Sequence, residues 1–417
     1  MIALTKPITA NVEPMTLLPE NDYRRALAAF YHAAVENDLP VALWRYPNRQ
    51  ALRALVDFGG RPRATTIDFT QKTPGFVFAP FVNQNVTAAL FIKASLVLDP
   101  TAYQTLYRSI SPDNEFEKAN EARFLATYRK FAFNAGPLSQ TWFTSKIPRR
   151  ANAFASKAEY CRLVAEAVDY IKAVGIKKIV TSRAIETPLP PDFSPVSTFE
   201  TLCERYPHAF VSLVSIPEVG TWIGASPEIF LSITPNEFQT VALAGTQALP
   251  AGVPLSQISW EAKEIEEQAL VSDYIRQFFG QQNIDPVSEE GPCTVSAGNV
   301  VHLQTKFRIQ LREPQLSNLA NQVLHKLHPT SAVCGMPQQQ ALSFILEKEN
   351  YDRAFYSGYL GPVHLNQESH LFVNLRCMQL NRRSAILYVG GGITKDSVPK
   401  AEWDETVLKS NTLLNVL

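Results

Sequence analysis

The stretch 210-FVSLVSIPEVGTWIGASPEIFLSITPNEFQTVALA-244 contains four short runs rich in β-branched and aromatic residues, separated by turns that contain proline, glycine or asparagine. Runs of this kind are typical of β-strands, which we predict at 210–216, 220–224, 229–233 and 240–244. The succession of strands without intervening helices indicates sheets built from neighbouring segments.

The rest of the chain alternates single helices with further strands. Helical patterns occupy 20–37, 113–130, 156–174, 259–279, 316–327, 337–350 and the end of the chain from Lys400, and strand patterns occupy 41–44, 75–80, 88–92, 176–182, 300–309, 358–363, 371–379 and 384–390. No regular βαβ repeat runs through this order. We therefore predict an α+β fold, in which large, mostly antiparallel β-sheets form the core and helices pack outside. A loop over 134–150 is the best candidate boundary, dividing the chain into 1–150 and 151–417.

Composition excludes several classes of function. The chain has 417 residues, of which 39 are basic and 39 acidic, so its formal net charge is zero. This balance does not favour nucleic acid or an anionic membrane as a partner and suits a small-molecule substrate. The five cysteines are spread without a CxxC or Cys/His cluster, which indicates a reducing compartment. No apolar run approaches the roughly 18 residues of a membrane helix, and we expect a cytoplasmic protein.

Two acidic patches carry glutamates three residues apart, Glu264 with Glu267 and Glu402 with Glu405. On a helix, positions i and i+3 share a face, so each pair could present two carboxylates to one hard cation such as Mg²⁺. Most pairs of this kind are simply solvated helix faces, and the spacing alone does not distinguish the two interpretations.

Two further segments could supply acid–base chemistry. Lys177 and Lys178 stand in a β-branched run, where a buried ammonium needs a partner or a task, and strand alternation lets only one of them face a cleft. The alternative is that these lysines lie on an exposed edge strand, where their charge prevents unwanted pairing with another strand. Glu228 follows a Gly-Ala-Ser-Pro turn and could be a general acid if its pKa were raised, although glutamates in turns are usually solvated.

Candidate anion-binding groups lie near predicted strand ends. Gly245-Thr246 and Gly390-Gly391-Gly392 each follow a strand and allow close approach to backbone N–H groups. Arg376 is predicted in the middle of a strand, where its planar fork suits a carboxylate. Lys409 lies one helical turn after Glu405 and could join the same site. His328, just before a proline, could orient a substrate or be structural.

The order of these motifs resembles the chorismate-utilising enzymes, and within them the isochorismate synthases. The resemblance covers roughly 150–417, and its motifs are Lys178-Ile-Val-Thr-Ser-Arg183, Gly224-Ala-Ser-Pro-Glu228, Leu243-Ala-Gly-Thr246, Lys263-Glu264 to Glu267, Leu327-His-Pro-Thr-Ser-Ala-Val-Cys-Gly335, Asp352-Arg353 to Gly358, Leu375-Arg376, Gly390-Gly-Gly-Ile393 and Glu402-Trp403 to Lys409. Residues 1–150 match no motif and are expected to complete the same fold.

The resemblance implies a role for each candidate residue. Chorismate would bind with Mg²⁺, whose direct ligands would be Glu267 and Glu405, with Glu264 and Glu402 nearby or acting through water. Lys178 would be the base that activates a water for attack at C2 of the ring, and Glu228 the acid that protonates the departing C4 hydroxyl. The substrate carboxylates would meet Gly245, Thr246, Tyr356, Arg376, Gly391 and Lys409, and His328 would help to orient the substrate.

One segment, which contains Ala332, indicates which product the resemblance implies. Ala332 stands where relatives that use ammonia carry a threonine-containing sequence, which favours water as the nucleophile and implies no obligatory glutamine amidotransferase partner. An isochorismate synthase of menaquinone or siderophore synthesis is therefore the expected function. The alternatives are a salicylate synthase, an anthranilate or aminodeoxychorismate synthase component, and a non-catalytic binding protein of the same fold. Ser331 in place of a usual proline and Gln268 in place of a usual histidine depart from the family pattern.

Overall fold

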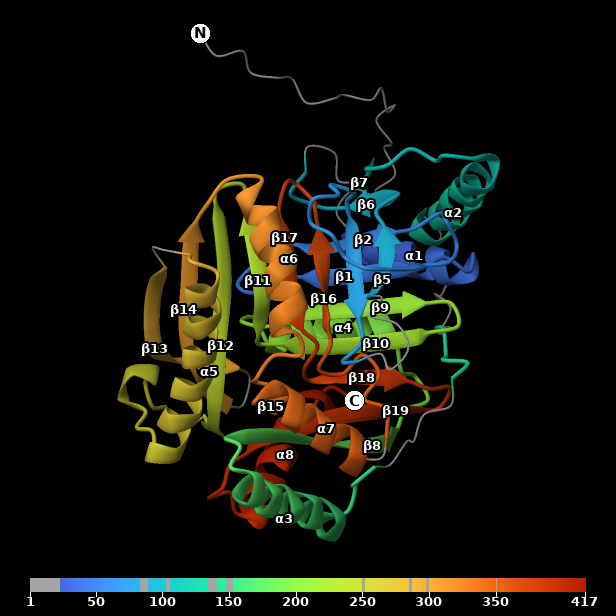
Figure 1. Cartoon of the computed structure of the whole chain (residues 1–417). Helices are drawn as coiled ribbons and strands as arrows, with labels where there is room; N and C mark the ends of the chain where they lie inside the picture. The colour runs from blue at the N-terminus through green and yellow to red at the C-terminus, as the bar shows by residue number, and fades with distance from the viewer. Residues whose placement is uncertain are drawn as a thin grey trace.

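A computed structural model describes residues 23–82, 89–102, 106–133, 141–147, 153–249, 252–284, 287–297, 300–349 and 351–417 (Figure 1). Its helices are α1 (Tyr23–Glu36), α2 (Glu115–Phe133), α3 (Lys157–Val174), α4 (Pro195–Arg205), α5 (Ala262–Gln281), α6 (Gln315–Leu327), α7 (Gln338–Lys348) and α8 (Pro399–Leu414), with a 3₁₀ turn at Leu255–Gln257. Most of the loop predicted at 134–150 lies outside the described residues.

The described strands form two large sheets. The first has the order β15 (Gly335–Met336), β8 (Lys178–Pro188), β19 (Ser384–Ile393), β18 (Cys377–Leu380), β10 (Gly220–Ser226), β9 (Phe210–Ile216), β1 (Val41–Arg45), β2 (Leu52–Val56), β6 (Leu96–Leu98) and β7 (Leu106–Arg108). The second has the order β13 (Ser288–Ala297), β14 (Val300–Gln310), β12 (Glu237–Ala248), β11 (Ile229–Thr234), β17 (Ser369–Val373), β16 (Tyr359–Val363), β4 (Gly75–Ala79), β5 (Ala89–Lys93) and β3 (Arg63–Thr65). Neighbouring strands pair antiparallel in both sheets, which confirms the predicted α+β class.

An aromatic core joins the two sheets face to face. The rings of Trp44 on β1 and Phe76 on β4 lie 5.7 Å apart, and those of Phe210 on β9 and Phe372 on β17 stack at 3.9 Å. All four side chains are fully or almost fully buried. Two more apolar clusters fill the outer faces, where α1, α2 and α4 cover the first sheet and α5 and α6 cover the second. The sheets are thus held between helices, as the pattern of the sequence predicts.

Strands from the first 150 residues lie inside both sheets. In the first sheet β1 pairs with β9 on one side and β2 on the other, and in the second β4 pairs with β16 and β5. The N-terminal and C-terminal parts of the chain therefore share their sheets and their core.

The segment predicted as a single strand at 371–379 is divided into two strands. The chain leaves the second sheet after β17 and enters the first at β18, and the link between them contains Arg376 at a φ of 48°. The backbone of Asn374 bonds to the turn before β16, because its N–H donates to Gly358 O at 2.8 Å. Arg376 therefore stands at the passage between the sheets and not within a strand, contrary to the prediction.

Helix α3 shows how local sequence positions the first sheet. The hydroxyl of Ser156 accepts from Glu159 N, the carboxylate of Glu159 accepts from Ser156 N, and Gly175 ends the helix at a φ of 74°. These are a capping box and a left-handed C-cap, so both ends of this predicted helix are confirmed. Gly175 leads directly to β8, whose first residue is Lys178.

Candidate active site

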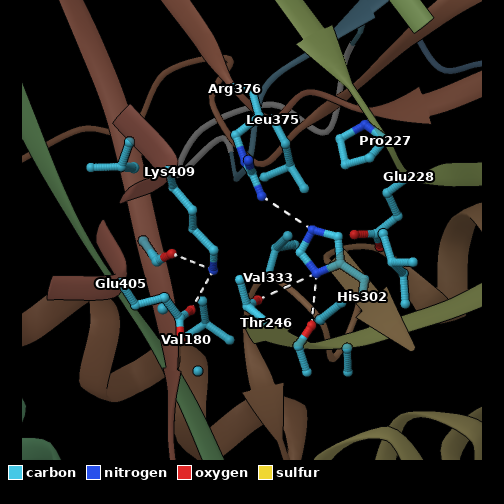
Figure 2. Close-up of a pocket in the computed structure, with 18 of the residues that line it drawn as sticks. Val180, Pro227, Glu228, Thr246, His302, Val333, Leu375, Arg376, Glu405 and Lys409 are labelled. Atoms are coloured by element: carbon cyan, nitrogen blue, oxygen red, sulfur yellow. Dashed lines mark hydrogen bonds and ion pairs between the residues drawn. The ribbon is translucent and has the colours of Figure 1, made fainter. Parts of the chain in front are cut away.

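A pocket opens where the two sheets meet α5 and α8 (Figure 2). Eleven predicted site residues line it, namely Lys178, Glu228, Gly245, Thr246, Glu267, Ala332, Tyr356, Arg376, Gly391, Glu405 and Lys409. They come from β8, β12, β19, two helices and four connecting segments, so residues far apart in the sequence converge only in the folded chain. Outside this lining set are His328, Glu264 and Glu402.

Lys178 is buried at the start of β8, whereas its neighbour Lys177 is exposed. Its Nζ donates to Oε1 of Glu267 on α5 at 2.6 Å. The strand β8 is paired along its length with β19, and its beginning is also paired with β15, so Lys178 does not guard an open edge. Burial of Glu267 would raise its pKa, but Lys178 and then Lys409 and Lys263 outweigh this and lower it. Lys178 is therefore paired with the carboxylate of Glu267 where it enters the pocket.

Glu228 is buried between β10 and β11, contrary to the usual exposure of glutamates in turns. Ser226 holds the turn, because its hydroxyl donates to Val373 O at 2.5 Å and accepts from Glu228 N at 3.3 Å. Burial raises the pKa of Glu228 to about 8, although Lys178 and Lys409 act to lower it. At neutral pH this side chain is a protonated acid facing the pocket.

Three groups make one side of the pocket suitable for anions. Arg376 is buried, and burial lowers its pKa to about 10, which leaves it charged at neutral pH. The Nζ of Lys409 donates to Glu405 Oε1 at 2.6 Å and to Gly390 O at 3.1 Å (Figure 2). Tyr356 keeps its proton, because burial raises its pKa to about 12. Together they offer charged and neutral donors to a carboxylate.

Gly245 and Thr246 lie in a bulge of β12 and not at its end as predicted. The pairing with β14 shifts register between Ala244 and Gln247, and Gly245 has a φ of 69°. A bulge releases residues from regular pairing, and both Gly245 and Thr246 line the pocket.

His302 on β14 is a pocket residue that the sequence analysis missed. Its Nδ1–H donates to Gly245 O at 2.7 Å, and its Nε2 accepts from Arg376 Nη2 at 3.3 Å (Figure 2). Burial, followed by the charges of Arg376 and Lys409, lowers its pKa to about 3, so the imidazole is neutral. The signal that could have found it is a histidine near the start of the predicted strand 300–309.

Strand β19 continues to Ile393 and includes all three glycines, whereas the prediction ended it at Gly390. Gly391 and Gly392 pair with Thr181 and Val180 of β8. A Cβ built on Gly392 would lie 2.5 Å from Glu267 Oε1 and 2.7 Å from Lys178 Cε, so a side chain there would force both of these side chains to move. Because these glycines have no side chains, the carboxylates of Glu267 on α5 and Glu405 on α8 can lie close to the backbone of β19.

The four glutamates of the acidic patches occupy different environments. Glu402 is 1% exposed, and its Oε1 accepts from Lys263 Nζ at 2.7 Å, while its Oε2 is buried without a partner among the described residues. Burial and the nearby charge of Glu405 raise the pKa of Glu402. Glu264 lies under the bulge, where a Cβ on Gly245 would be 3.2 Å from Glu264 Cβ.

Oxygens of Glu402 and Glu405 face the same space above Gly391. A Cβ built on this glycine would lie 3.5 Å from Glu402 Oε2 and 3.6 Å from Glu405 Oε1. Carboxylate oxygens are the donors that Mg²⁺ prefers, so the donor chemistry fits this cation. Within the described ranges, no group of three or more His, Cys, Asp and Glu side chains is arranged to hold a metal ion, and three lysines pair with Glu267, Glu402 and Glu405.

His328 does not reach this pocket. It lines a separate cavity with Ile67, Pro80, Leu324 and Tyr359, and its Nε2 donates to Pro80 O at 3.2 Å. The turn after α6 presents Ala332 to the active-site pocket and directs the histidine to the other side. The prediction that His328 binds substrate is therefore corrected to a structural role beside β4.

Comparisons with known proteins place the chain in a family. A model of the family described as chorismate binding enzyme matches residues 87–417, and the chain belongs to this family of enzymes. The vibriobactin-specific isochorismate synthase of Vibrio cholerae is 26% identical over 310 residues, 72% of this chain and 76% of that protein. The isochorismate synthase of Escherichia coli strain K12 is 27% identical over 269 residues, 63% of this chain and 68% of the relative.

The fold is also found in a solved structure. The menaquinone-specific isochorismate synthase from Escherichia coli superposes with a TM-score of 0.75 at 20% identity, over 94% of this chain and 91% of that chain. At this identity the likeness supports the fold alone. Among the residues that our structure describes, no helix combines the length and apolar character that crossing a membrane requires.

Proposed function

We propose that this protein is an isochorismate synthase, which interconverts chorismate and isochorismate. The observation that carries the proposal is the presence, in one pocket, of a buried lysine and a buried glutamic acid whose pKa is about 8. This reaction needs a neutral base and a protonated acid, so Lys178, which is paired with Glu267 in the structure, would first have to give up its proton. Relatives named as isochorismate synthases support the same reaction.

In the proposed mechanism the two groups act on different oxygen atoms. Lys178 accepts a proton from a water as the water oxygen forms a bond to C2 of the ring. The ring double bonds shift, the C4–O bond breaks, and Glu228 gives its proton to the departing hydroxyl, which leaves as water. One water enters and one leaves, so the substrate and the product are isomers, and solvent then carries the proton from Lys178 back to Glu228.

The other pocket residues would bind and orient the substrate. Arg376, Lys409 and the hydroxyl of Tyr356 are suited to one substrate carboxylate, and the Gly245-Thr246 bulge to the second. His302 would keep Arg376 in place by accepting a hydrogen bond from its guanidinium group. The side chain of Ala332 is a methyl group and adds no polar group to the pocket, which suits water as the nucleophile.

We also propose that Mg²⁺ is the cofactor, held by Glu267 and Glu405 with Glu264 and Glu402 nearby. When bound, the cation would balance the acidic patches and provide a positive group for a substrate carboxylate. The unpartnered Oε2 of Glu402 and the space above Gly391 support this proposal. The named relatives belong to siderophore and menaquinone synthesis, and the proposal concerns the reaction that they share.

The test is incubation of the purified protein with chorismate and Mg²⁺, followed by chromatographic separation of the products. We expect isochorismate, formed without ammonia, and its formation should be about 100-fold slower or more in the Lys178→Met variant. Salicylate with pyruvate would assign the protein to the salicylate synthases, and anthranilate or aminodeoxychorismate formed only with ammonium would assign it to the amination branch. Binding of chorismate without any turnover would contradict an enzymatic role.

A further inference from the structure

A second, smaller cavity lies behind Glu228 and extends away from the active-site pocket. Its volume is about 20 Å³, and most of its wall is apolar. Its polar lining residues are Glu228, Thr240, Tyr274, Thr330 and Ser331. Glu228 and Ala332 line both this cavity and the active-site pocket, so they separate the two spaces. We call it the rear cavity.

Two hydroxyl groups in the rear cavity lack a partner. Ser331 is 2% exposed, and its Oγ makes no hydrogen bond within the described structure; the same holds for Thr330 Oγ1, which is also buried. The two other hydroxyls of the cavity are engaged, because Thr240 Oγ1 donates to Phe230 O at 2.7 Å and Tyr274 OH donates to Lys326 O at 3.4 Å. Buried hydroxyls are costly unless they are hydrogen-bonded, and Ser331 and Thr330 therefore require a partner.

The carboxyl group of Glu228 also makes no hydrogen bond to another group in the described structure. The hydrogen bonds of this residue in the described structure are made by its backbone, with its N–H donating to Ser226 Oγ and its carbonyl accepting from Val373 N. No described group donates to the carboxyl oxygens. A buried carboxyl and two buried hydroxyls thus border one small space without bonding to one another or to other protein groups.

The size and chemistry of the rear cavity match one water molecule. A buried water needs a space of roughly 15 Å³ and two to four polar partners. We propose that the rear cavity holds one water that bonds Ser331 Oγ, Thr330 Oγ1 and the carboxyl of Glu228, and that Ser331 is thereby a positioning residue for the acid. The water site rests on the structure, and its effect on turnover rests on the proposed function.

This water would act on the carboxyl without taking its proton. When Glu228 gives its proton to the leaving hydroxyl, the new carboxylate can accept a hydrogen bond from the water, whose position the two hydroxyls hold. The charged groups that lower the pKa of the carboxyl are Lys178 on β8 and Lys409 on α8, and the titratable group on the rear side is Tyr274 on α5. The water therefore adds to the two lysines in stabilising the ionised form, and its loss would raise the pKa of Glu228 further.

The first test measures Glu228 directly in the substrate-free protein. The carboxyl band is followed by infrared difference spectroscopy during a pH titration and is assigned with Glu228→Gln. Removing the bond to the bridging water should raise the midpoint by about half a pH unit in Ser331→Ala and in Thr330→Val. Thr240→Val is the matched control, since it removes a hydroxyl from the same cavity that is bonded elsewhere. A midpoint that is unchanged or lowered in both variants would overturn the proposal.

Two further measurements separate this inference from the proposed function. A high-resolution crystal structure should show one water in the rear cavity, and an empty cavity would contradict the inference even if the enzyme is active. In the active enzyme, the alkaline limb of the kcat/KM profile should move upward by the same amount in Ser331→Ala and return in Ser331→Thr, which restores a hydroxyl. If chorismate is not converted, the titration and the crystal structure still decide the water site.

Discussion

The ammonium of Lys178 lies 2.6 Å from Oε1 of Glu267, so the candidate base and a candidate metal ligand are hydrogen-bonded to each other. The lysine side chain is 2% exposed and that of the glutamate 15%. In such a buried pair each charge depends on the other, because either one alone would be costly away from water. The same contact joins β8 to α5 and so connects the two sheets of the fold at the pocket.

Replacing Lys178 by methionine should lower turnover of chorismate by about 100-fold or more, the usual loss when a general base is removed. The matched control is Lys177→Met, because Lys177 is the exposed neighbour and does not line the pocket. Steady-state rates at saturating chorismate measure the effect. Equal rates in the two variants would exclude Lys178 as the base.

Glu228→Gln should also reduce turnover by about 100-fold and should remove the alkaline limb of the rate profile. The acid works only when protonated, so the wild-type kcat/KM should fall as the pH rises through about 8. A profile whose alkaline limb is the same in the variant would show that another group controls it.

The stability of the folded protein should also depend on the protonation of Glu228. Its pKa rises from 4.5 to about 8 on folding, so the folded protein holds this proton more tightly than the unfolded chain. The corresponding stability is present at low pH and is lost progressively as the pH rises from 4.5 to about 8. Thermal unfolding at a series of pH values should therefore show Glu228→Gln gaining stability relative to wild type across this range. A constant difference would contradict the raised pKa.

Lys263→Met should destabilise the protein by about 1–3 kcal/mol, because it leaves Glu402 buried beside Glu405 without its partner. The double variant Lys263→Met/Glu402→Gln should recover most of this loss. Urea unfolding measures both. If the double variant is no more stable than the single one, the ion pair does not account for the loss.

Glu405→Gln should weaken the binding of Mg²⁺ measured by calorimetry, because one of the proposed ligands becomes a neutral amide. Asp404→Asn is the control, since Asp404 lies next to Glu405 on the same helix but forms an exposed ion pair with Lys400. Equal affinities in both variants and the wild type would remove Glu405 from the proposed metal site.

Gly392→Ala should reduce turnover by about 100-fold, because the new Cβ would displace both Glu267 and Lys178 from their positions. Gly280→Ala, in α5, is the control, because nothing lies within 4 Å of a Cβ at that position. Activity and circular dichroism of both variants should be compared. An active Gly392→Ala enzyme would show that the close packing at β19 is not required.

Much of the fold follows from local patterns in the sequence. The helix Lys157–Val174 begins at a capping box and ends at a glycine, and the run of strands from Phe210 to Ala248 alternates with clear turns. The strand Ser288–Ala297 was missed, because most of its side chains are exposed at a sheet edge and leave no apolar pattern. The change of sheet at Arg376 was missed because β-propensity continues on both sides of the link.

The sequence by itself determined the class of fold, the order of the motifs and the set of residue types from which the site is made. Only the tertiary structure decided that Lys178 is buried while Lys177 is exposed, that His328 faces another cavity, and that His302 joins the site. It also decided that burial raises the pKa of Glu228 to about 8 and that Ser331 lines a cavity beside this residue. The physical reason is that burial and electrostatic fields depend on groups brought together from distant strands and helices, whereas helix caps, turns and strand patterns depend on residues close in the chain.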